Sequence, residues 1–256
     1  MFKYSLSDLT TTTVERLQRR YRRDGIFGVV TATIALIYRE WVRSHVPRYR
    51  KTVEFNRVEV PVEVPYLDPL IPGYDPAWYT SDVPGYESSE VEALQEYCRP
   101  GDDVVIIGGG FGVTAVVAAE AVGVDGSVVV YEAAEVAIDR TEQTMEHHNL
   151  ADRVELTHAI VGDAISLKGE SGAAEVIQPS KLPEGDVYEI DCEGAEMTVL
   201  ENYTANPRVV SVETHAQFGS PKQKVKIVLE GDGYRIQQEN NKDVDGIDHI
   251  VALRSD

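Results

Sequence analysis

Cysteine is scarce in this sequence: the 256 residues contain only Cys98 and Cys192. Two distant cysteines can form at most one disulfide, and neither belongs to a Cys-x-x-Cys pair of the kind that binds zinc. The count therefore argues against a disulfide-stabilised secreted scaffold and against a cysteine-ligated metal site, and no metal is expected. We expect a reducing, cytoplasmic setting.

A long uninterrupted apolar run is also missing. The apolar stretch near the N-terminus, Ile26 to Tyr38, has 13 residues and includes Gly28. It is shorter than the ~20 residues that span a bilayer, and it follows a polar segment, unlike the apolar stretch of a signal peptide. We predict a helical segment over residues 7–45 that does not cross a membrane. It could pack on the rest of the chain, join two copies in a homo-oligomer, or lie peripherally at a membrane through residues 16–43.

Positive charge is rare beyond residue 51. The chain has a net charge of −19, but residues 1–51 hold 11 Lys/Arg and 4 Asp/Glu, which gives this segment a net charge of +7. The remainder is strongly acidic, and such a surface disfavours binding to nucleic acid. Dense acidic charge with few lysines also fits a halophilic protein, because high salt screens the repulsion.

Apolar runs with strand and helix periods alternate regularly after residue 83. Strands are expected at 103–107, 127–131, 154–158, 186–190, 209–213, 234–238 and 249–253, with helices between most of them. This alternation predicts a doubly wound α/β fold with a mostly parallel seven-stranded sheet and an antiparallel edge strand. We assign residues 83–256 to this domain and residues 1–82 to an N-terminal helical extension with a Pro/Tyr-rich connection. Residues 53–64 alternate like an extended arm or two short strands, and residues 162–181 read as a loop or hairpin.

A glycine-rich loop follows the first strand of this pattern, and an acid follows the second. The loop carries Gly108, Gly109, Gly110 and Gly112, and Glu132 comes 20 residues after Gly112. Glycine lets the backbone approach a ligand closely, and an acid at this place binds the ribose hydroxyls of an adenosine ligand. The G-x-G-x-G spacing lacks the third glycine of the dinucleotide fingerprint, which favours S-adenosylmethionine (SAM) over NAD. An NAD-dependent oxidoreductase is the alternative.

The most specific string begins at Asp191 and reads Asp-Cys-Glu-Gly-Ala-Glu, at the end of an expected buried strand. With Tyr86-Glu87, Pro100-Gly101-Asp102, Glu213-Thr214-His215 and Gly233-Tyr234, this string resembles the FkbM-like family of SAM-dependent class I methyltransferases, over about residues 84–253. The resemblance implies a Rossmann-like fold, SAM as cofactor, and O-methylation of a sugar, glycan or other small polyhydroxylated acceptor.

The resemblance also suggests residue roles. Asp191, Glu193 and His215 are the candidate catalytic residues, because methyl transfer to a hydroxyl needs a base. Gly108, Gly109, Gly110, Gly112, Glu132, Ala133, Glu87 and Asp163 are the candidate cofactor-binding residues, with Asp163 directed at the adenine. The family has an acid two places before the first loop glycine, where this chain has Ile106. Glu87 is a candidate substitute for that acid, and a catalytically inactive SAM-binding relative is a further alternative.

Overall fold

The computed structural model describes residues 6–74, 78–162, 171–241 and 246–255. The chain divides into two units, one formed by Met1–Val53 and Val62–Ser81 and the other by Glu54–Pro61 and Asp82–Asp256. Each unit is described by itself below.

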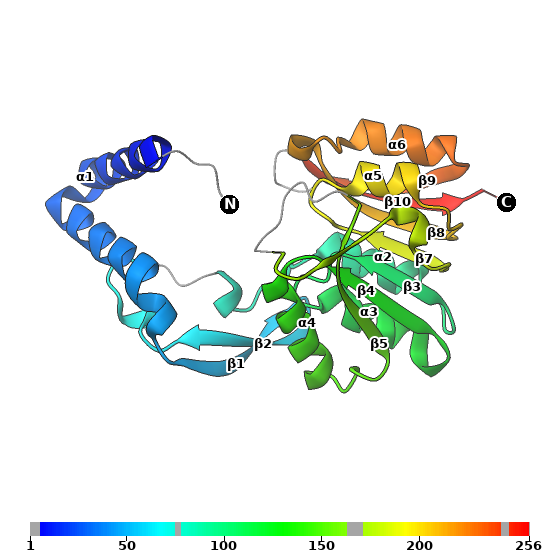
Figure 1. Ribbon diagram of the computed structural model, residues 1–256, viewed down its shortest axis with the longest axis horizontal. Coiled ribbons are helices and arrows are strands. Elements are labelled where there is room, and N and C mark those ends of the chain that lie inside the picture. Colours follow the sequence, from blue (N-terminus) through cyan, green and yellow to red (C-terminus); the bar gives the residue numbers. More distant parts are fainter. Residues whose placement is uncertain (1–5, 75–77, 163–170, 242–245, 256) are drawn as a thin grey trace. The chain divides into compact units, whose positions relative to one another are not determined.

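The smaller unit is built around helix α1 (Leu6–Ile37), which continues in the short turns η1 (Tyr38–Val42) and η2 (Arg43–His45). Its backbone leaves the helical region at Gly25 (φ 64°, ψ −156°), and the ribbon changes direction along α1 (Figure 1). Beyond the kink, the buried carboxylate of Asp68 in η3 (Asp68–Leu70) accepts bonds from the Tyr38 hydroxyl (2.6 Å) and from Arg43 (3.0 Å). A buried charge needs such partners, so Asp68 fixes the end of the helical segment.

One face of this helical segment is apolar and exposed. Its large apolar side chains that face solvent are Ile26, Phe27, Val30, Ile34, Ile37, Trp41 and Val42. By length and composition, Asp24–His45 is long and apolar enough to cross a membrane, and 11% of its most apolar window is buried. The sequence led us to expect a segment too short to cross a membrane. The helical backbone continues past Tyr38 through η1 and η2, which makes the segment longer than the 13-residue apolar run.

A β-hairpin joins the two units. Strands β1 (Arg48–Phe55) and β2 (Val58–Pro65) turn at Asn56 and Arg57, both with positive φ, as a two-residue hairpin requires. The hairpin matches the extended pattern expected over residues 53–64. Its tip belongs to the larger unit, where Phe55 is fully buried and stacks on Tyr86 with ring centroids 4.8 Å apart. A short turn, η4 (Trp78–Thr80), precedes the larger unit's main run.

The larger unit is a mixed sheet of eight strands within the described residues. These are β3 (Asp103–Ile107), β4 (Ser127–Glu132), β5 (Val154–Val161), β6 (Glu175–Ile177), β7 (Val187–Ile190), β8 (Val209–His215), β9 (Tyr234–Asn241) and β10 (Ile247–Arg254). Their order is β6-β5-β4-β3-β7-β8-β10-β9, and β10 runs antiparallel to both of its neighbours. The doubly wound, mostly parallel fold expected from the sequence is confirmed.

One detail of the expected sheet is corrected. An eighth strand, β6, pairs in parallel with β5 inside the region read as a loop or hairpin. It has only three residues, and its exposed Glu175 and Val176 give no buried strand pattern. The last two strands, β9 and β10, form an antiparallel pair at one edge of the sheet, as expected, with β9 outermost.

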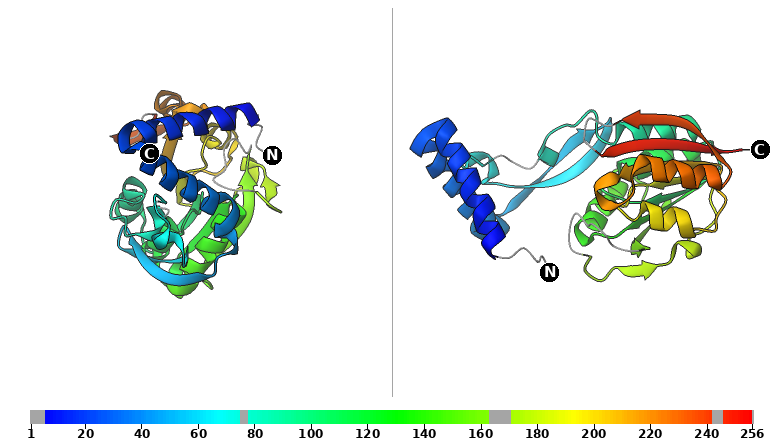
Figure 2. Two further views of the ribbon diagram at one scale, coloured as in Figure 1. Left: turned by 90° about the vertical axis from the view of Figure 1, so that its left-hand side faces the viewer. Right: turned by 90° about the horizontal axis from the view of Figure 1, so that it is seen from above.

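Helices cover both faces of this sheet (Figure 2). Alternate strand residues, among them Ile107, Ile190 and Val212, form one apolar core with α5 (Glu196–Asn202) and α6 (Lys222–Gly231). The opposite face is covered by α2 (Ser88–Tyr97), α3 (Val113–Val122) and α4 (Glu135–His147), and α3 is almost entirely small and apolar. Burial on both faces explains why the central strands read as continuous Val/Ile runs.

The strand order reverses direction between β3 and β7. The chain proceeds outward from β3 through β4, β5 and β6, and then returns to the other side of β3 with β7 and β8. At such a switch point, the loops after neighbouring strands diverge and leave room for a ligand at the carboxyl ends of the strands. The loops that begin after Ile107, Glu132, Ile190 and His215 therefore define where a site can form.

The core on the α6 side allows a direct test. Leu229 on α6 is fully buried, whereas Ile227 on the same helix is 59% exposed. We expect Leu229→Ala to lower the free energy of unfolding by about 2–5 kcal/mol, because it removes buried methyl groups and leaves a cavity. Ile227→Ala should change it by less than about 0.5 kcal/mol. Urea unfolding followed by circular dichroism measures both, and equal effects would contradict this core assignment.

Candidate active site

The glycine loop after β3 packs tightly against the end of β7. Gly108 has φ +114°, and a Cβ at this position would overlap the carbonyl oxygen of Asp191. Its N–H donates to the carbonyl of Tyr131 (2.9 Å), which ties the loop to β4 as well. Gly112, with φ 80°, begins helix α3. The loop therefore needs glycine for backbone conformation and for close approach to β7.

Glu132 holds the glycine loop from the end of β4. One of its carboxylate oxygens accepts the N–H groups of Gly109 (2.8 Å) and Gly110 (2.9 Å), and the other accepts the N–H of Ala134 (2.7 Å). A carboxylate offers about four lone-pair positions, so about one is left to accept a hydroxyl group. Ala133 follows it and is half-buried. The arrangement brings Glu132 to the loop as expected, while its ribose contact stays a prediction.

Glu87 and Tyr86 lie next to Gly110 of the loop. A Cβ on Gly110 would lie 3.4 Å from a Glu87 carboxylate oxygen and 3.4 Å from the Tyr86 hydroxyl. Burial, followed by the neighbouring Glu87 carboxylate, raises the pKa of Tyr86 well above its ordinary value of 10. The Phe111 ring packs edge-on against Tyr86, with Arg140 4.8 Å above the Phe111 centroid. Tyr86 and Phe111 were not among the predicted site residues, because an aromatic next to a motif reads equally well as core.

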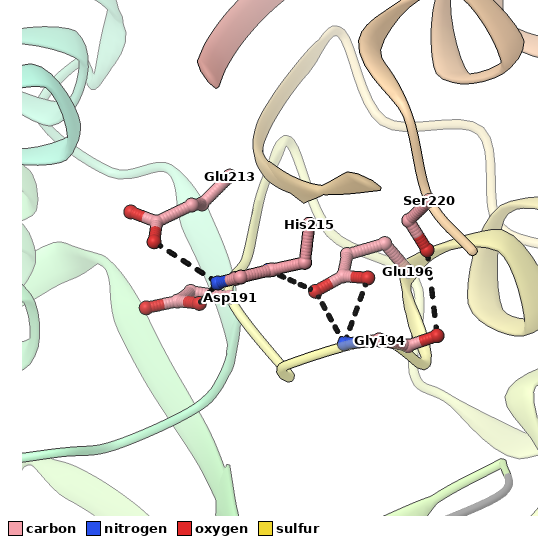
Figure 3. A network of polar contacts seen from close by, with 6 residues as sticks. All are labelled: Asp191, Gly194, Glu196, Glu213, His215 and Ser220. Atoms are coloured by element: carbon pink, nitrogen blue, oxygen red, sulfur yellow. Dashed lines mark hydrogen bonds and ion pairs between the residues drawn. The ribbon is translucent and has the colours of Figure 1, made fainter. Parts of the chain in front are cut away.

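The Asp191–Glu196 string forms a tight turn between β7 and α5. Glu193 (φ 50°) and Gly194 (φ 112°) both adopt left-handed backbone, which is uncommon for glutamate. Both carboxylate oxygens of Glu196 accept the Gly194 N–H at 2.9 Å, and the Ser220 hydroxyl donates to the Gly194 carbonyl (3.3 Å; Figure 3). Glu196 is fully buried. Glu196 thus has a local structural role, since its carboxylate closes the turn.

His215, the last residue of β8, lies among three carboxylates (Figure 3). Its Nδ1 is 2.8 Å from Glu196, and its Nε2 is 3.2 Å from Glu213 and 3.9 Å from Asp191. Burial lowers the pKa of His215, but the bonds to Glu196 and Glu213 outweigh it and raise the pKa from 6.5 to about 10. At neutral pH the ring is therefore a cation that donates from both nitrogens. This protonated ring differs from the neutral imidazole expected for a base.

Glu189 is a buried acid that was not predicted. It lies in the middle of β7, is fully buried, and has no hydrogen-bond partner at either carboxylate oxygen. Burial raises its pKa well above 4.5, and the nearby Asp191 and Glu90 carboxylates act in the same direction. Its parallel partner on β3 is Ile106, the position where the resembling family carries an acid. The only sequence signal was a glutamate inside an apolar strand, which is normally too costly without a role.

The structure thus brings most of the predicted residues to one edge of the sheet. Asp191 and His215 lie together, and Glu193 belongs to the same turn as Asp191. Asp163 lies outside the described residues. One atom each from Asp191, Glu213 and His215 lie within 4.8 Å of one another, a spacing that could hold a metal ion, although no metal was expected from the sequence.

No protein-family model matches the sequence, and no curated protein matches it. Similar solved structures include a SAM-dependent O-methyltransferase from Thermotoga maritima, with 18% identity, TM-score 0.45, and coverage of 66% of this chain and 65% of that one. A SAM-dependent methyltransferase from Aquifex aeolicus has 15% identity, TM-score 0.42, and coverage of 66% and 93%. Precorrin-6y C5,15-methyltransferase from Geobacter metallireducens has 15% identity, TM-score 0.44, and coverage of 66% and 87%. All three TM-scores lie below 0.5, so these structures do not establish what this chain does.

The charge of His215 can be measured. Because its folded pKa is raised above the unfolded value, the stability it contributes is complete below about pH 6.5 and is lost as the pH rises through about 10. We expect the His215 ring resonances in an NMR titration to shift near pH 10 and not near 6.5. Glu196→Gln should lower this midpoint, because it removes a carboxylate that favours the cation.

Glu201→Gln is the matched control for that titration, since Glu201 lies on the same helix and is exposed. It should leave the midpoint unchanged. A parent protein whose His215 titrates near pH 6.5 would contradict the charged assignment.

Proposed function

We propose that this chain is a SAM-dependent methyltransferase. The observation that carries the proposal is the charge around the glycine loop: Glu132 and Glu87 lie next to it, and Asp191 and Glu213 follow on the neighbouring strands. SAM is cationic at its sulfonium and its ammonium group, whereas NAD carries an anionic pyrophosphate. An acidic surrounding attracts the first and repels the second.

The residues present also fit the two ends of SAM. Glu132 keeps an acceptor position for a ribose hydroxyl beside the loop. Ile106 is fully buried and apolar, so the acid usual at that place is missing. Glu87, whose carboxylate lies next to Gly110, supplies a negative charge for the ammonium group instead. The resemblance to the FkbM-like family supports the same cofactor.

The residues around Asp191 give the reaction a base. Bound SAM would supply an activated methyl group. An acceptor hydroxyl must lose its proton as it is methylated, and Asp191, half-buried at the switch point, is the carboxylate placed to take it. The protonated His215 stabilises the ionised forms of Asp191 and Glu213. Glu193, in the same turn, is the second candidate base.

We propose O-methylation of a sugar, a glycan or another small polyhydroxylated molecule. The support is the resemblance in the Asp191–Glu196 string and the hydrogen-bonding side chains at this edge of the sheet. Cytoplasmic localisation is part of the same proposal, in keeping with the two free cysteines.

Calorimetry with S-adenosylhomocysteine and NAD tests the cofactor. We expect the full-length protein to bind S-adenosylhomocysteine and not NAD, in buffer containing EDTA. Glu132→Gln should weaken S-adenosylhomocysteine binding at least about tenfold. The glutamine NH₂ group cannot accept a hydrogen bond, so either the loop N–H groups or the ribose hydroxyl would lose an acceptor.

Glu142→Gln, on the exposed surface of α4, is the control and should bind like the parent. Binding of NAD alone would favour the oxidoreductase alternative. Binding of S-adenosylhomocysteine without methyl transfer to any of a panel of sugars would favour an inactive relative.

We further propose that residues 16–43 bind peripherally to an anionic membrane surface. The exposed apolar side chains from Phe27 to Trp41 recur every three or four residues, which gives a single apolar stripe. The segment before them is arginine-rich, and residues 1–51 carry a net charge of +7. An amphipathic helix with basic residues lies in the plane of the interface, with its apolar stripe in the lipid. A homo-oligomer contact is the competing use of the same stripe.

Sedimentation with lipid vesicles tests this surface. We expect the parent to bind vesicles containing phosphatidylglycerol, and to bind less at 1 M salt, where the Debye length falls to about 3 Å. The double variant Ile34→Asp/Ile37→Asp should lose most of this binding. Val124→Asp, which changes an 85% exposed apolar residue of the larger unit, should not.

Vesicle binding that is equal in all three proteins would contradict the membrane proposal. A double variant that instead changes from dimer to monomer in analytical ultracentrifugation would assign the stripe to a homo-oligomer.

A further inference from the structure

We propose that Asp191, Glu213 and His215 form a binding site for a divalent metal ion of the Mn²⁺ type. One ligand atom from each residue lies within 4.8 Å of the other two. Ligands bonded at about 2.1 Å to a common ion lie roughly 3.0–3.5 Å apart when adjacent. The distances from His215 Nε2 to Glu213 (3.2 Å) and to Asp191 (3.9 Å) are close to this range. Mixed imidazole and carboxylate ligands suit Mn²⁺ and its neighbours in the first transition row.

The orientation of His215 is that of a metal ligand with its supporting carboxylate. Glu196 accepts from Nδ1, and its own position is fixed by the Gly194 N–H at both oxygens. This bond directs Nε2 toward Glu213 and Asp191 (Figure 3). Ligating histidines almost always donate their other ring nitrogen to a carboxylate or carbonyl, which fixes the ring and strengthens the ligand. Nε2 of His215 thus faces the carboxylates of Glu213 and Asp191, and either a proton on Nε2 or a metal ion can lie between the ring and these carboxylates.

The buried carboxyl group of Glu189 is a second, independent observation that favours a cation at Asp191 and Glu213. Two residues before Asp191 on β7, it projects from the same face of the sheet, and its neighbour in register on β8 is Ser211, two residues before Glu213. It is fully buried, and neither of its carboxylate oxygens has a hydrogen-bond partner. An unpaired carboxyl group this deeply buried is costly. A divalent ion at Asp191 and Glu213 would offset that cost through its charge.

The ion would lie beside the loop that the proposed function assigns to SAM, because Asp191 abuts Gly108. A hydroxyl group bound to such an ion loses its proton more readily. Asp191 would then act as a ligand of the ion, which would hold the acceptor oxygen, and Glu193 in the same turn would take the proton of the hydroxyl. This last consequence rests on the proposed methyl transfer, whereas the metal site itself does not.

Electron paramagnetic resonance with Mn²⁺ alone tests the site on the full-length protein, freed of metal by chelation and without SAM. We expect one tight site per chain, with echo modulation from the ¹⁴N nucleus of a bound imidazole. Asp191→Asn, Glu213→Gln and His215→Gln should each weaken binding at least about tenfold, and Glu196→Gln about 10- to 100-fold. His215→Gln should also abolish the nitrogen modulation.

Glu120→Gln, on the exposed surface of α3, is the matched control, because an acidic chain also attracts cations at its surface. It should bind Mn²⁺ like the parent. Thermal unfolding with and without Mn²⁺ checks each variant's fold, and Mn²⁺ should raise the melting temperature of the parent and of Glu120→Gln by more than that of the ligand variants.

Mn²⁺ binding without nitrogen modulation, or binding that is unaffected by the ligand variants, would overturn the site. S-adenosylhomocysteine binding in EDTA is a separate measurement. A protein that binds S-adenosylhomocysteine but not Mn²⁺ would therefore refute the metal site and leave the proposed function intact.

Discussion

The carboxylate of Glu196 is the contact on which the arrangement of the site depends. It closes the left-handed turn at Gly194, and with the same buried oxygens it receives Nδ1 of His215 from the neighbouring strand. The turn sets where Asp191 emerges from β7, and the bond to His215 sets what Asp191 and Glu213 face. One side chain thus couples the backbone of the β7–α5 connection to the charge state of a residue on β8.

The glycine loop is held by a comparable device. Glu132 binds two loop N–H groups and the start of α4, while the Gly108 backbone packs directly on Asp191. Buried polar groups that hydrogen-bond to one another in this way hold a single geometry and leave the loop little freedom to change conformation. One half of the site lies on β3 and β4 and the other on β7 and β8, and the two halves are joined by the contact between the Gly108 and Asp191 backbones. A side chain at position 108 would break this contact, so the position requires glycine.

Much of this architecture could be predicted from the sequence, because buried parallel strands are continuous apolar runs and the helices between them keep their own period. Positions such as Asp191 and His215 could be assigned to one edge, since the carboxyl ends of parallel strands meet there. Strand β6 could not, because three partly exposed residues carry no pattern. The charge of His215 could not either, since it depends on Glu196, which is brought beside it only by the turn into α5. Glu189 could not be predicted for a related reason. It stands out because its buried carboxylate oxygens have no hydrogen-bond partner, and a sequence does not show which groups surround a side chain.

The hairpin β1–β2 has a consequence for how the chain can be divided. Its strands begin and end in the smaller unit, but its tip, Glu54–Pro61, belongs to the larger one, where Phe55 packs between Tyr86 and Phe111. The chain therefore crosses the boundary between the units three times, after Val53, after Pro61 and after Ser81, and no single cut in the polypeptide separates them. A shortened chain that starts at residue 82 would lack the Phe55 ring that stacks on Tyr86 beside the glycine loop, so residues 54–61 are part of the larger unit's core although they lie in the N-terminal extension of the sequence.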